Sequence, residues 1–77
     1  MSGLTLMRLN EDERRFIAYL RRRGGAAYLY EIRRALGMPR SSAWRMAKRL
    51  ADWGLIRTVK AKVGRKQLIR VLLRRGS

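Results

Sequence analysis

Glycine and proline divide this sequence into segments that are too short for long helices. Gly24 and Gly25 follow one segment with helical hydrophobic spacing, and Gly37 follows the next. Pro39 opens a third such segment, which Gly54 closes. Glycine ends helices because it adopts left-handed torsions without a steric cost, and proline is tolerated only in a first helical turn. The sequence therefore predicts three short helices, with a tight turn between the last two.

The first segment begins with a helix-capping pattern. Asn10 and Glu13 have the spacing of a capping box, in which each side chain accepts a hydrogen bond from the other residue's backbone amide. At about 100° per residue, Phe16, Ile17 and Leu20 then share one face. We expect a helix that begins near residue 11, ends at the paired glycines and buries this apolar face.

The second and third segments are also amphipathic. In residues 28–36 the apolar face consists of Tyr28, Leu29, Ile32, Ala35 and Leu36. In residues 40–53 it is a continuous stripe made of Ala43, Met46, Ala47, Leu50 and Trp53. Both faces should pack against the core. Either Pro39 lies in the first turn of the third helix, or Ser41 caps it.

After Gly54 the spacing alternates, and β-branched residues become common. We expect strands over residues 55–60 and 67–73, joined by a turn over residues 61–66. On the second strand the core side should carry Ile69, Val71 and Leu73. Leu68 and Leu72 should then point to the other side. The predicted fold is mostly α-helical, with three helices and a two-stranded β-hairpin.

The composition argues against an enzyme. The 77 residues include no Cys and no His, so the usual metal ligands and the usual general base near neutral pH are missing. Three of the five acidic residues, Glu11, Asp12 and Glu13, lie at one helix start, where capping and the helix dipole explain them. We therefore expect no catalytic site, no metal and no cofactor.

The length predicts one domain over residues 1–77, with a short N-terminal arm over residues 1–9. No apolar run approaches the roughly 18 residues of a membrane-spanning helix, and the first ten residues do not resemble a secretory signal. We expect a cytoplasmic, nucleoid-associated protein with no membrane partner.

The sequence contains more leucines than one small core requires. This excess predicts a homodimer held partly by Leu4, Leu6, Leu68 and Leu72.

The charge is strongly positive and unevenly distributed. The formal net charge is +15, and from residue 14 onward 19 basic residues face only 2 acidic ones. Such an excess on a compact surface attracts polyanions, of which nucleic acid is the most common. Solubility alone needs a net charge of only about 2 to 8. Nucleic acid is therefore the predicted partner.

The order of elements over residues 9–73 resembles the winged helix-turn-helix domains of MarR-like and related prokaryotic transcription regulators. The closest stretch is EIRRALGMPRSSAWRMAKRLADWGLI, residues 31–56, with its Leu-Gly, Ser-rich helix start, Arg-Leu and Gly-Leu-Ile. The resemblance implies double-stranded DNA as the partner and a basic hairpin, the wing, that lies on the DNA backbone or in the minor groove. Larger relatives bind small ligands with extra terminal helices. This chain has no residues left for them, so we expect no small-molecule ligand.

The outer side of the helix at residues 40–53 is the predicted DNA-reading surface, because a helix fits the roughly 12 Å wide major groove. We expect Arg45 to bond to a guanine edge, and Lys48 and Arg49 to meet phosphates. Trp44 would contact a thymine methyl or a sugar, or cover the edge of the second helix. The candidate residues on this helix are Arg40, Ser41, Ser42, Trp44, Arg45, Lys48 and Arg49, and those at the hairpin tip are Lys62, Arg65 and Lys66.

Three functions are compatible with these features. The first is a sequence-preferring transcription regulator, because the predicted reading surface mixes arginine with short hydroxyl side chains. The second is an architectural chromatin protein with little base preference, which the extra arginines at 14, 15, 21, 22 and 23 would also serve, although Arg15 can pair with Glu11. The third is an RNA-binding module, for which we find no pair of aromatic stacking residues.

Overall fold

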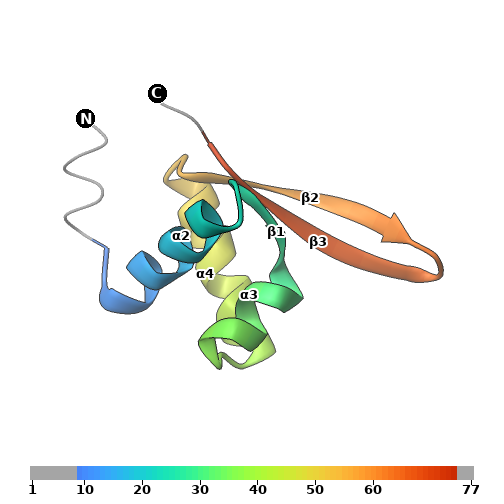
Figure 1. The fold of residues 1–77 in the computed structure, drawn as a ribbon, viewed down its shortest axis with the longest axis horizontal. Helices are drawn as coiled ribbons and strands as arrows, with labels where there is room; N and C mark the ends of the chain where they lie inside the picture. Colours follow the sequence, from blue (N-terminus) through green and yellow to red (C-terminus); the bar gives the residue numbers. More distant parts are fainter. Residues whose placement is uncertain (1–8, 75–77) are drawn as a thin grey trace.

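The computed structural model describes residues 9–74 (Figure 1). Within this range, three helices pack against one end of a three-stranded antiparallel sheet with the strand order β1-β3-β2. The helices are α2 (Glu11–Arg22), α3 (Leu29–Leu36) and α4 (Arg40–Asp52). The strands are β1 (Ala26–Tyr28), β2 (Ile56–Val63) and β3 (Lys66–Leu73). The predicted fold class, a winged helix-turn-helix, is confirmed.

Helix α2 begins and ends where the sequence predicted. The Asn10 side chain accepts a hydrogen bond from the Glu13 amide at 2.8 Å, and the Glu13 side chain accepts one from the Asn10 amide at 2.9 Å. Gly24 and Gly25 follow the helix with positive φ angles of 77° and 94°. The predicted apolar face of α2 is buried. The start and the end of this helix are therefore set by neighbouring residues.

The turn between α3 and α4 consists of residues 37–39. Gly37 has φ 66°, in the left-handed region, and ends α3. Pro39, with φ −61°, is the residue that flanks the start of α4. Neither predicted alternative is correct, because Pro39 is the cap itself rather than a residue of the first turn, and Ser41 already lies in that turn.

Residues 26–28, expected as a connector and the start of a helix, form strand β1. Ala26 pairs with Leu72, and Tyr28 pairs with Arg70. Tyr28 is therefore not on the apolar face of the second helix, and this prediction is wrong. The sheet has one strand more than the predicted hairpin, because β3, near the far end of the chain, pairs with residues 26–28. This pairing ties β3 to the helices.

The core includes one residue of the predicted arm and omits, besides Tyr28, two residues that were expected in it. Leu9 is buried among the core residues. Ala35 is exposed, because the buried side of α3, centred on Leu29 and Ile32, lies about 90° away around the helix. Trp53 is 42% exposed because α4 ends at Asp52. Helical spacing therefore no longer determines the direction of the Trp53 side chain.

The hairpin is longer than predicted. The strands run to Val63 and from Lys66, so the expected turn over residues 61–66 shrinks to Gly64 and Arg65. Gly64 has φ 62°, as two-residue hairpin turns commonly require. Lys62 and Lys66 therefore lie within strands rather than in the turn. Figure 1 shows that the far end of the hairpin extends well beyond the helices, and the molecule measures 40 × 25 × 21 Å.

The two sides of β3 differ as expected. Val71 is fully buried, and Ile69 and Leu73 pack against the core. Leu68 and Leu72 are half-buried and are not among the core residues. Leu4 and Leu6, which we expected at a subunit contact, lie outside the described residues. None of the described helices is both long enough and apolar enough to cross a membrane.

Candidate nucleic-acid interface

Helix α4 has one buried side and one basic side. Ala43, Ala47 and Leu50 are completely buried. The seven candidate residues predicted on this helix are all exposed, and they are Arg40, Ser41, Ser42, Trp44, Arg45, Lys48 and Arg49. At about 100° per residue, Arg45 lies close to the middle of the side opposite the buried alanines. The core therefore presents the Arg45 guanidinium directly to solvent.

The basic side of α4 ends at an acidic residue. Asp52 is exposed in the last turn, about two turns after Arg45 and on the same side of the helix. A carboxylate at this position repels phosphate, whereas the positive end of the helix dipole lies at the start of α4. A polyanion is therefore attracted most strongly to the N-terminal half of α4.

Two candidate residues of α4 contact each other. The Lys48 ammonium lies 5.9 Å from the centroid of the Trp44 ring. A cation over an aromatic face is attracted by the electrons of the ring. Trp44 is 38% exposed, so part of the ring remains accessible to a ligand.

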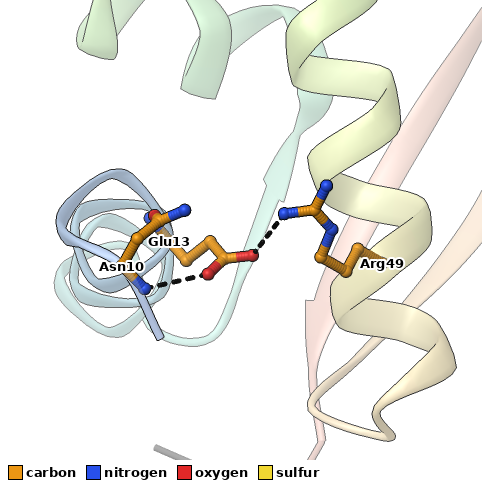
Figure 2. A network of polar contacts seen from close by, with 3 residues as sticks. All are labelled: Asn10, Glu13 and Arg49. Carbon is orange, nitrogen blue, oxygen red and sulfur yellow. Dashed lines mark hydrogen bonds and ion pairs between the residues drawn. The ribbon is translucent and has the colours of Figure 1, made fainter. Parts of the chain in front are cut away.

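Arg49 differs from the other exposed cations of α4 because it is part of an ion pair. Its Nη1 donates to Oε2 of Glu13 at 3.3 Å, while Oε1 of Glu13 accepts from the Asn10 amide (Figure 2). The Glu13 side chain is only 2% exposed, and that of Arg49 is 54% exposed. The sequence predicts only a role in the helix start for Glu13. Its spacing to Phe16 and Leu20 could have indicated that it lies on the buried side of α2.

A groove with a volume of about 500 Å³ lies between α3, the start of α4 and β3. Its residues are Leu29, Tyr30, Arg33, Arg34, Arg40, Lys66, Gln67, Leu68 and Ile69. The four cations of this groove form no ion pair within residues 9–74. Only Arg40 and Lys66 were predicted as site residues. Arg33 and Arg34 were expected on an outer helix face, and the pairing of β1 with β3 brings this face beside the wing.

The wing residues form a second, separate group of cations. Arg65 lies in the turn, and Lys62 and Lys66 lie in the adjoining strands, all exposed. In Figure 1 the turn is far from α4. The predicted site residues are therefore divided between α4 and the wing, and the groove connects the two groups through Arg40 and Lys66.

The arginines of α2 are partly neutralised. Its four arginines and Arg23, which follows the last turn, are all exposed, but Arg15 pairs with Glu11 at 3.2 Å, as predicted, and Arg23 pairs with Glu31 at 2.8 Å. Exposed ion pairs of this kind add little to stability. They do reduce the positive charge that this helix offers to a polyanion.

A helix-turn-helix followed by a basic hairpin defines the class of winged helix-turn-helix DNA-binding domains. The model of the IclR helix-turn-helix domain matches residues 15–60, which cover more than half of the sequence. The chain therefore belongs to the IclR helix-turn-helix domain family, a family of DNA-binding domains of transcription regulators. The match confirms the predicted class but not the finer likeness to MarR-like proteins. A search of curated proteins found no match.

Proposed function

We propose that the protein is a sequence-preferring regulator that inserts the N-terminal half of α4 into the major groove of double-stranded DNA. The observation that carries this proposal is the division of α4, with Ala43, Ala47 and Leu50 fully buried and Arg45 exposed opposite them. A helix docked in this way presents a fixed set of donors to base edges. The protein would act by occupying DNA, without a catalytic step or a cofactor.

The remaining cations would hold the sugar-phosphate backbone. Arg40 and Lys48 lie on α4, whereas Lys62, Arg65 and Lys66 lie on the wing. Contacts of this kind position a protein on DNA without reading the sequence. The groove supports the proposal because it places Arg33 and Arg34 between Arg40 of α4 and Lys66 of the wing. A DNA strand that passes from α4 to the wing would meet them.

The test of this proposal is Arg45→Ala. If Arg45 bonds in a bidentate manner to a guanine, its loss should cost about 1 to 3 kcal/mol on the preferred duplex and much less on a random one. Equilibrium titrations of the wild type and of Arg45→Ala with the preferred and the random duplex, all at one salt concentration, give the four dissociation constants needed. The preferred duplex is first selected from a random library.

Two controls accompany this comparison. Circular dichroism should show an unchanged fold, because the side chain is exposed and alanine favours helix. Arg14→Ala, which removes an exposed arginine of α2 outside the candidate residues, is the matched loss of one charge. An equal loss on both duplexes after Arg45→Ala would mean that Arg45 touches only phosphate. The architectural function, to which the exposed Arg14, Arg21 and Arg22 of α2 could contribute, would then be favoured.

We also propose that the protein is a homodimer that uses the outer side of the sheet. This side carries the half-buried Leu68 and Leu72 and, on β2, Val59 and Val63, which are 40% and 50% exposed. Residues paired across two antiparallel strands share a side of the sheet, and Ala61 pairs with Leu68. Arg57, Arg70 and Lys66 lie on the same side, because they pair with Leu72, Val59 and Val63, so the contact would combine apolar residues with cations. A two-fold dimer suits DNA half-sites that lie about 10 base pairs apart.

Leu72→Lys should convert the dimer to a monomer, because a buried ammonium without a partner is costly. Sedimentation equilibrium at about micromolar concentration measures the mass, and 9.0 kDa corresponds to one chain. If Leu72→Lys loses its fold by circular dichroism, Val63→Lys at the more exposed position takes its place. A wild-type protein that is monomeric and still binds DNA tightly would contradict the dimer.

A further inference from the structure

Glu13 is the one buried charged residue within residues 9–74. It lies in the first turn of α2, 36 residues from its partner Arg49 on α4. Within the described part of the chain, one of its carboxylate oxygens accepts from the Asn10 amide and the other from the Arg49 guanidinium. A buried carboxylate needs such partners, because an unpaired charge away from water is strongly disfavoured. Glu13 therefore holds Arg49 against α2.

This contact makes Arg49 different from its neighbours on the basic side of α4. Arg40, Arg45 and Lys48 form no ion pair among the described residues. Arg49 remains half exposed, so it is within reach of a polyanion, but an adjacent carboxylate offsets its positive charge. Glu13 engages only Nη1 of Arg49, so the other guanidinium N–H groups can still donate to a phosphate. That phosphate would approach the Glu13 carboxylate and be repelled by it, so the contact is weaker than one made by an unpaired arginine.

We propose that Glu13 is a specificity-determining residue of the DNA site, because it restrains Arg49 from contacting the phosphates of any sequence. This inference rests on the proposed function. Phosphate contacts strengthen binding to all sequences alike, so each additional one raises non-specific affinity. An ion pair within the protein that weakens one such contact lowers binding to random DNA. The discrimination between preferred and random sites is thereby preserved.

The test compares Glu13→Gln with Glu11→Gln. Both changes remove one negative charge from the first turn of α2, but Glu11 is exposed and pairs only with Arg15. Glutamine at position 13 can still accept from the Asn10 amide, so the capping box is retained. At about 0.1 M salt, the affinity of Glu13→Gln for a random duplex should be about 3- to 10-fold higher than that of Glu11→Gln. The slope of log affinity against log salt concentration should become steeper by about 0.9, which is the effect of one added phosphate contact. Affinity for the preferred duplex should rise less.

A second background shows whether the increase in affinity passes through Arg49. In the Arg49→Gln protein, adding Glu13→Gln should raise the affinity for the random duplex no more than adding Glu11→Gln does. If Glu13→Gln does not fold by circular dichroism, Glu13→Asp replaces it. Aspartate keeps the charge but is shorter by one methylene, so its carboxylate withdraws from Arg49. The affinity for the random duplex should then rise although the net charge is unchanged.

Several results would overturn the inference. Equal affinities for Glu13→Gln and Glu11→Gln would make Glu13 a purely structural residue. Weaker binding of a folded Glu13→Gln to the random duplex would mean that Glu13 instead orients Arg49 for a phosphate contact. An increase in affinity that persists without Arg49 would assign the effect to another cation. If the wild-type protein itself shows no salt-dependent DNA binding, the proposed function fails, and this outcome is distinct from the other three.

Discussion

Raising the salt concentration from about 50 to about 200 mM should weaken binding to double-stranded DNA by about 10³- to 10⁵-fold, because about 6 to 10 phosphate contacts release their counterions. The exposed cations suffice for this number. They lie on α4, on the wing and in the groove between them, and include Arg34, Arg40, Lys48, Lys62, Arg65 and Lys66. Fluorescence anisotropy of a labelled duplex, titrated at several salt concentrations, gives the slope. A shallow slope would contradict an interface built mainly on phosphate contacts.

The wing offers a control for this measurement. Replacing Lys62, Arg65 and Lys66 together with alanine should lower affinity similarly on preferred and random duplexes. The salt slope should fall by about 0.9 for each phosphate that the variant no longer binds. A weakening confined to the preferred duplex would mean that the wing reads bases, contrary to the role proposed for it.

Phe16→Ala should reduce the free energy of unfolding by about 3 to 5 kcal/mol, because it removes a completely buried ring and leaves a cavity. A domain of this length has a total stability of only about 4 to 12 kcal/mol. The variant should therefore be partly unfolded at room temperature or melt far below the wild type. Urea unfolding followed by circular dichroism measures the difference.

Trp53→Ala is the matched aromatic change. Helical spacing predicted Trp53 in the core, whereas the structure leaves it 42% exposed beyond the end of α4. Its loss should cost clearly less than the loss of Phe16, because less buried surface disappears from the fold. Equal losses of stability would show that Trp53 packs in the core after all.

The parts of the fold that could be predicted are those that depend on residues close together in the chain. The capping box of Asn10 and Glu13 joins residues three positions apart, and its hydrogen bonds lie where the sequence placed them. Gly37 ends α3 because of its own backbone torsions. The buried stripe of α4 repeats at helical spacing, so its basic side, with Arg45 in the middle, could be located in advance. Each of these features is set by residues within one helix or its adjoining turns.

The parts that could not be predicted depend on residues far apart in the chain. Residues 26–28 form a strand because β3 supplies their partners, and three residues are too few to show an alternating pattern. The same pairing brings Arg33 and Lys66 into one groove. Glu13 meets Arg49 only because α2 and α4 pack against a common core. Local spacing shows which side of an element is buried. Packing between elements determines which charged side chains meet, because only the assembled core sets the distance between them.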